Sequence, residues 1–364
     1  MTHRELELPF LRLPDIIPFM NLSVGIVGLA NVGKSTLFNA LLKKQVANVA
    51  NYPFCTIEPN KGIVEVPDGR LPVLAKIVNT TKIVPAVVEF YDIAGLVRGA
   101  SKGEGLGNQF LANIREVSVI CHVVRFFEDP NVIHVKNRVD PKSDVELVNS
   151  ELILADLQTL EKQREPKEAV QILKVEMNKG TLARDVKLDD KQREQVKKIF
   201  LLTDKPVIYV ANVSEEQLNI PDFPDRPDFP ERPLIPLSAK MESDLASLNE
   251  EEQKEYLAQY NISEPGLDRL IKLAYETLGL ISFLTAGEKE VRAWTIKQGM
   301  TAQQAAGVIH TDFEKNFIKA DVVSFEDFVQ NNGWVNCRSL GKVRSEGKEY
   351  LMKDGEVVEF KVGV

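Results

Sequence analysis

Residues 28–36 read Gly28-Leu29-Ala30-Asn31-Val32-Gly33-Lys34-Ser35-Thr36 and match the phosphate-binding pattern G-x-x-x-x-G-K-[ST]. The apolar run Leu22–Val27 precedes them and predicts a buried strand, and the amphipathic run Thr36–Leu42 predicts a helix. A glycine-rich turn between such elements points backbone N–H groups and a helix N-terminus at bound phosphates. A chance glycine turn is the weaker interpretation, because the motif is complete and its flanks are correct.

The motif assigns roles to individual residues. We expect Lys34 to reach the β- and γ-phosphates and to stabilise the charge that is transferred, and we expect the Ser35 hydroxyl to bind Mg²⁺. The nucleotide contacts in this loop are predicted to come from Asn31, Val32, Gly33, Lys34, Ser35 and Thr36.

Two further segments are expected to meet the same metal ion. Asp92 begins a D-x-x-G sequence at the end of the strand-like run Pro85–Tyr91, and Thr56 lies in an irregular polar stretch after the first helix. In nucleotide switches such residues hold Mg²⁺ and close on the γ-phosphate. Each sequence alone means little, but their order after the phosphate loop predicts that Ser35, Thr56 and Asp92 form the metal site.

The segment Asn212-Val213-Ser214-Glu215 stands where GTPases usually have N-K-x-D. Glu215 is a methylene longer than Asp, and Val213 lacks the lysine stem that covers the base. We therefore expect the paired contact to guanine to fail while Asn212 still meets N7 of the base, so that ATP is preferred over GTP. Ser238-Ala239-Lys240 resembles the S-A-K loop of GTPases and favours GTP, and we weigh it below the side-chain contact.

The usual glutamine that orients the attacking water is absent, because Leu96 follows the D-x-x-G sequence. Hydrolysis is then slow or uses another group. His134 is the catalytic candidate. His122 is the other histidine considered, and a core position fits it better because it lies within a predicted strand. Asn31 is positioned to help place K⁺ beside the phosphates.

Composition limits the class of protein. The 364 residues suffice for two or three domains, and the net charge of −8 argues against a domain that binds nucleic acid by bulk electrostatics. Three widely separated cysteines form no zinc or disulfide pattern, which suits a reducing compartment. Of these, Cys55 lies in the irregular stretch, where a redox role is weaker than ordinary packing. No run is long enough for a membrane span, so we expect a cytoplasmic protein.

Strands alternating with helices predict an α/β fold with a largely parallel sheet. We expect the nucleotide-binding domain over 21–141 and 203–280, an inserted α-helical hairpin over 142–202, and a separate small α+β domain over 281–364. Residues 1–20 are expected to be a disordered tail or a start-site extension. The proline-rich repeat within 221–236 predicts an extended loop.

Several of these segments together resemble the YchF/Obg-like ATPase family. The resemblance rests on Gly28–Thr36, 51–60, Asp92–Val97, Gly99–Phe110, Asn212, and Phe283–Phe317 with its Val291–Thr295 and His310–Lys315 segments, and it covers about 21–364. It implies a G-domain-like P-loop NTPase with a C-terminal TGS domain, ATP preferred over GTP, and association with the ribosome or its large subunit in translation or stress response. It also maps the catalytic loop histidine onto His134. The proline repeat, the shortened helical insertion and the S-A-K loop depart from the family pattern.

We therefore predict a Mg²⁺-dependent ATP hydrolase that acts as a nucleotide-controlled switch, is a monomer and has no membrane partner. Two alternatives stay open. One is a GTP-dependent ribosome assembly factor, which the S-A-K loop favours, and the other is a ribosome-binding adaptor whose hydrolysis is incidental.

Overall fold

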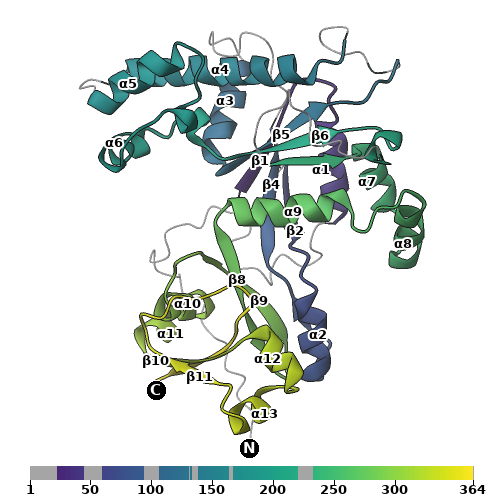
Figure 1. Cartoon of the computed structure of the whole chain (residues 1–364), viewed down its shortest axis with the longest axis vertical. Helices are drawn as coiled ribbons and strands as arrows, with labels where there is room; N and C mark the ends of the chain where they lie inside the picture. Colours follow the sequence, from purple (N-terminus) through teal and green to yellow (C-terminus); the bar gives the residue numbers. More distant parts are fainter. Residues whose placement is uncertain are drawn as a thin grey trace, which may run out of the picture.

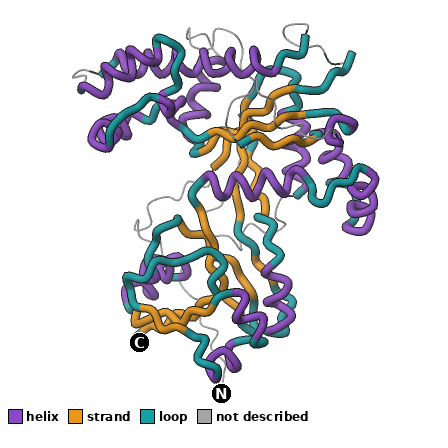
Figure 2. Tube along the Cα trace, in the orientation of Figure 1, coloured by secondary structure: helices purple, strands orange, loops and turns teal. Residues whose placement is uncertain are grey.

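The computed structural model describes residues 23–44, 60–93, 106–130, 132, 138–163, 167–219 and 233–363. Two six-stranded sheets dominate it, and one lies above the other in Figure 1 and Figure 2. Among the described residues, no helix has both the length and the apolar character needed to cross a membrane.

The first sheet has the strand order β2-β4-β1-β5-β6-β7. Five of its strands run parallel, and β2 is antiparallel to β4 at one edge. The bounds are β1 Ser23–Val27, β2 Lys61–Glu65, β4 Val87–Asp92, β5 Val119–Arg125, β6 Val207–Asn212 and β7 Leu234–Leu237. The central strands β1, β5 and β6 are buried along their whole length, as their near-continuous apolar sequences predict. The expected parallel α/β fold is confirmed.

Helices cover this sheet and connect its strands (Figure 1). They are α1 Lys34–Lys43, α3 Leu106–Glu116, α7 Ala239–Leu245, α8 Glu250–Gln259 and α9 Gly266–Thr277. The amphipathic helix α9 lies between the two sheets in Figure 1, and its Leu270 and Ala274 are fully buried. Both residues belong to one core cluster that also contains Leu284 and Val357 of the second sheet, so the two halves share a hydrophobic core.

A helical segment projects from β5 and returns to β6. It contains α4 Pro141–Glu161, α5 Glu168–Met177 and α6 Asp190–Val196, with a separate core of its own. The Asp140 side chain caps α4 by accepting a hydrogen bond from the Ser143 backbone N–H at 3.1 Å. The buried Asp156 carboxylate accepts hydrogen bonds from the backbone N–H groups of Leu202 and Thr203, both at 2.8 Å, and thereby ties the returning chain to α4.

The C-terminal part forms the second sheet, in the order β11-β10-β12-β8-β9-β3. Its strands are β8 Leu280–Ala286, β9 Val291–Lys297, β10 Phe317–Val323, β11 Arg344–Glu346 and β12 Val357–Val362. Its helices are α10 Ala302–Ile309, α11 Thr311–Lys315, α12 Phe325–Gln330 and α13 Trp334–Ser339. This mixture of strands and short helices is the α+β arrangement that the sequence predicts from Ile281 onward.

One segment from the nucleotide-binding half lies in the C-terminal half. Helix α2 (Arg70–Ile77) and strand β3 (Ile83–Val84) follow β2 in sequence, and β3 pairs with β9 as the edge strand of the second sheet. The ion pairs Arg70–Asp354 at 2.7 Å and Lys82–Glu290 at 2.6 Å reinforce the contact. The predicted domain boundaries remain predictions, and this segment crosses the division between them.

Candidate phosphate-binding and metal site

The phosphate loop joins β1 to α1 and is shaped by its two motif glycines. Gly28 has φ 150°, and an added Cβ would lie 2.4 Å from the backbone oxygen of Val123. Gly33 has φ 99°, and an added Cβ would lie 2.2 Å from Nδ2 of Asn212. A side chain at either position would collide with its neighbour, which explains why glycine stands at both. Helix α1 begins immediately after Gly33, so its free N–H groups face the loop.

Lys34 is the first residue of α1 and is buried. Its Nζ donates a hydrogen bond of 2.6 Å to the backbone oxygen of Leu29, across the loop. Burial lowers the pKa of Lys34, and the negative charge of Asp92 opposes that shift. A partly desolvated ammonium group that spans the loop is well placed to interact with phosphate oxygens.

Asp92 ends β4, which lies beside β1 in the sheet. Burial raises the pKa of Asp92, while the charge of Lys34 and a hydrogen bond with Ser35 act in the opposite direction. Its Oδ1 atom is buried and accepts no hydrogen bond from any described residue. A buried carboxylate oxygen without a partner is costly, so this atom marks a place where a ligand would stabilise the site.

Asn212 links the phosphate loop to the opposite side of the site. Its Nδ2 donates to the backbone oxygen of Val32 at 2.8 Å, and its Oδ1 accepts from the backbone N–H of Ala239 at 2.9 Å. The side chain is buried at the end of β6. Sequence reasoning predicted a base contact for Asn212 and missed this linking role, which leaves one N–H of Nδ2 for a base.

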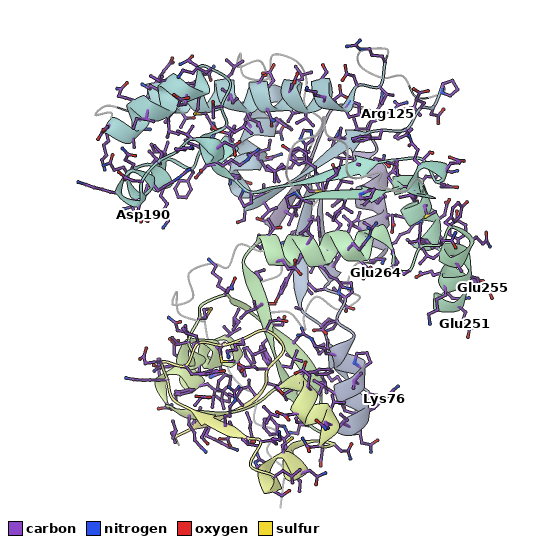
Figure 3. All side chains as sticks on the ribbon, in the orientation of Figure 1. Lys76, Arg125, Asp190, Glu251, Glu255 and Glu264 are labelled. Atoms are coloured by element: carbon purple, nitrogen blue, oxygen red, sulfur yellow. The ribbon has the colours of Figure 1, made fainter. Side chains whose placement is uncertain are left out.

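Arg125 lies at the end of β5 (Figure 3). It is not among the site residues predicted from the sequence. Its guanidinium is buried and donates hydrogen bonds to the backbone oxygens of Phe127 at 3.1 Å and Val132 at 2.9 Å. It also lies 4.3 Å from the centre of the Phe127 ring. Arg125 therefore fixes the start of the loop that follows β5. An arginine at the end of an apolar strand is the only signal that the sequence offers for it.

Two family models match parts of this chain. A family model described as 50S ribosome-binding GTPase matches residues 23–160, and a model of the YchF GTPase C-terminal region, described as a protein of unknown function, matches 280–363. The Bacillus subtilis protein named ribosome-binding ATPase YchF is 49% identical and aligns over 95% of this chain and 100% of its own length. The protein of that name from Haemophilus influenzae is 48% identical, with the same coverage of 95% and 100%. The chain belongs to the YchF family.

A solved structure also resembles this YchF-family chain over most of its length. It is described as a YchF GTPase from Schizosaccharomyces pombe. The two structures match with a TM-score of 0.80 and 37% sequence identity, over 95% of this chain and 99% of the yeast chain. The bacterial relatives are named ATPases and the yeast structure is titled a GTPase. The family assignment predicted from sequence is confirmed, and these names do not agree on the nucleotide.

The structure brings most of the predicted site residues together. Lys34, Ser35 and Asp92 meet at one end of the parallel sheet, and Ser35 and Thr36 are exposed. Asn31 has φ 61° and an exposed side chain, whereas Val32 is buried.

After β6, Val213 is buried in the core, and Glu215 lies near Lys240 of the S-A-K loop. His122 is also buried, 5.5 Å from the Tyr209 ring. Thr56, Cys55, Leu96, His134, the tail 1–20 and most of the proline repeat lie outside the described residues.

Proposed function

We propose that this YchF-family chain is a Mg²⁺-dependent nucleoside triphosphatase that prefers ATP, is a monomer, and acts as a ribosome-associated switch. The observation that carries the proposal is the meeting of Lys34, Ser35 and Asp92 at the N-terminus of α1. A buried cation, a hydroxyl and a half-buried carboxylate at a helix N-terminus are the groups that phosphoryl transfer needs.

The residues present fit Mg²⁺. Oδ1 of Asp92 is a buried oxygen without a hydrogen-bond partner among the described residues, and the Ser35 hydroxyl lies beside the same carboxylate. Hard oxygen donors of this kind suit Mg²⁺, which commonly keeps several waters and binds one or two protein groups besides phosphate. We propose Ser35, Asp92 and Thr56 as the residues that hold the ion. When bound, Mg²⁺ neutralises charge on the β- and γ-phosphate oxygens.

The chain's own residues then perform distinct tasks. Nζ of Lys34 leaves the backbone oxygen of Leu29 and binds the phosphates, where its positive charge stabilises the transferred group. The backbone from Asn31 to Thr36 binds the phosphates through N–H groups. Asn212 holds the loop in place through Val32. We propose His134 as the group that replaces the missing glutamine in orienting water.

The preference for ATP is supported by the base side of the site. Val213 is buried in the core and offers no stem to cover a base. The Glu215 carboxylate already contacts Lys240 and Tyr260. A carboxylate that is engaged in this way is a poor match for the two adjacent N–H donors of guanine.

A GTP-dependent function is the second candidate. It is favoured by the S-A-K loop, in which the Ala239 backbone N–H binds Asn212 and the Ser238 side chain caps α7 by accepting from Met241 N at 3.3 Å. The yeast structure titled a GTPase also favours it. Association with ribosomes, including the large subunit, is supported by the names of the bacterial relatives and by the description of the matching family model.

The proposal is tested by phosphate release from ATP and GTP on one purified preparation, with Mg²⁺ and with excess chelator. We expect Mg²⁺-dependent release that is faster with ATP, and loss of release in Lys34→Ala. Sedimentation with ribosomal subunits, with and without nucleotide, tests the association. If release persisted in Lys34→Ala, the assigned phosphate site would be wrong. A Lys34→Ala chain that supported every cellular role without hydrolysis would favour the adaptor instead.

A further inference from the structure

The guanidinium of Arg125 holds the loop that follows β5 at three points. Nε donates to the backbone oxygen of Phe127 at 3.1 Å, Nη1 to that of Val132 at 2.9 Å, and Nη2 to that of Asp129 at 3.4 Å. Arg125 is only 2% exposed. A charged group is costly to bury unless it is paired, and here the carbonyl oxygens of one loop supply the pairing. The position of the loop is therefore tied to one side chain.

This loop begins beside the phosphate loop. Strand β5 is a parallel neighbour of β1, and a Cβ added to Gly28 would lie 2.4 Å from the backbone oxygen of Val123 in β5. Arg125 follows Val123 by two residues, at the end of the strand (Figure 3). The backbone N–H of Phe126 then donates to the backbone oxygen of Asn212 at 2.9 Å. The loop thus starts between β1, which leads into the phosphate loop, and β6, which ends at Asn212.

The last point that Arg125 holds is close in sequence to the proposed catalytic histidine. His134 follows Val132 by two residues, and two residues of chain span at most about 7 Å. Fixing the backbone at Val132 therefore limits where the His134 side chain can be placed. We propose that Arg125 is a positioning residue for hydrolysis, which holds the loop at Val132 so that the His134 imidazole reaches the attacking water. This inference rests on the proposed role of His134.

The role requires the shape of an arginine and not only its charge. The three loop oxygens accept from three different nitrogens of a planar group whose geometry is fixed. A lysine ammonium presents its donors from a single atom at the end of a flexible stem. Arg125→Lys therefore keeps a positive charge but cannot hold all three oxygens in the same arrangement.

The test compares Arg125→Lys with Arg193→Lys. Arg193 of α6 is a matched control, because its guanidinium also donates to three backbone oxygens of one loop, those of Ala183, Arg184 and Val186, at 3.4, 3.3 and 2.7 Å. That loop belongs to the helical segment between β5 and β6. We expect Arg125→Lys to lower kcat for ATP with Mg²⁺ by about tenfold, because a catalytic group is misplaced, and to leave the Kd of ADP unchanged. We expect Arg193→Lys to change neither. Counting kcat per ADP-binding site keeps unfolded chains out of the comparison.

A double-mutant cycle shows whether Arg125 acts through His134. We expect His134→Ala to lower kcat, and we expect Arg125→Lys to cause no further loss in that background, whereas a general effect on the fold would persist. An unchanged kcat in Arg125→Lys, or an equal loss in both backgrounds, would overturn the inference while the role of His134 stood. An unchanged kcat in His134→Ala would overturn the proposed role of His134 and this inference together.

Discussion

The side-chain amide of Asn212 donates a hydrogen bond of 2.8 Å to the backbone oxygen of Val32. The same amide accepts from Ala239 N at 2.9 Å, so one buried side chain joins the phosphate loop to the start of α7. Gly33 is required for this contact, because any Cβ there would overlap Nδ2 of Asn212. Asn212 thus ties the phosphate loop directly to the first turn of α7.

Asn212→Ala is expected to lower the free energy of unfolding by about 2–4 kcal/mol, because it leaves two buried backbone groups unpaired. It should also weaken ADP binding, since Val32 loses its support. Urea unfolding and ADP titration measure the two effects. Asn178→Ala is the matched control, because Asn178 Nδ2 makes one exposed hydrogen bond to the Lys174 backbone oxygen at 2.7 Å. Similar losses in the two variants would contradict the linking role.

The nucleotide half was largely predictable from sequence because its determinants are local. The phosphate loop, the buried strands and Asp92 follow from motifs whose residues are neighbours in the chain. Val213 and Glu215 were identified in the same way.

The remaining features depend on contacts distant in sequence. Strand β3 has only two residues, Ile83 and Val84, and its position is set by pairing with β9. Tyr260 directly follows the polar helix α8 and belongs to no motif, and its contact with Glu215 forms only once the chain is folded. The pairing of Arg125 with carbonyl oxygens likewise leaves no pattern in the sequence.

The contact between Arg70 and the C-terminal half can be tested at Gly355. Gly355 has φ 78°, and an added Cβ would lie 2.3 Å from Nη1 of Arg70, which pairs with Asp354. Gly355→Ala should cost roughly 1–2 kcal/mol for its backbone conformation and more for displacing Arg70. Gly341→Ala is the control, because Gly341 has φ 67° and open space around the added Cβ.

Unfolding in urea should therefore show Gly355→Ala as the less stable variant. In an Arg70→Ala background the cost of Gly355→Ala should shrink to that of Gly341→Ala. Equal costs in the original chain would show that Arg70 is free to move aside and that the ion pair adds little.

Because His122 is buried, we expect the free energy of unfolding to fall in acid. Burial, aided by the positive charges of Lys34 and Arg184, lowers the pKa of His122 to about 3 from 6.5. The unfolded chain takes up this proton below pH 6.5 and the folded chain does not. The stabilising contribution is complete above pH 6.5 and is lost as the pH falls toward 3, by up to about 1.4 kcal/mol per pH unit.

His122→Phe keeps a ring beside Tyr209 and should flatten this dependence between pH 6.5 and pH 5 in urea unfolding experiments. It should also retain hydrolysis, since the core position gives His122 no catalytic task. An unchanged acid dependence would contradict the buried neutral imidazole.

The position of Asn31 in the phosphate loop leads us to expect that the rate of hydrolysis depends on which monovalent cation is present. Its φ of 61° and exposed side chain leave it at the surface of the phosphate loop. We expect faster hydrolysis in K⁺ than in Na⁺ at equal ionic strength, and we expect Asn31→Ala to reduce the difference. Equal rates in the two salts would refute a potassium site.

We propose that Lys34, Ser35 and Asp92 form a hydrolytic site whose base side favours adenine. The most direct measurement is kcat/KM for ATP and for GTP on one preparation with Mg²⁺, with Lys34→Ala as the inactive reference. We expect a larger value for ATP and no turnover of either nucleotide by Lys34→Ala. Hydrolysis of GTP much faster than that of ATP would contradict it.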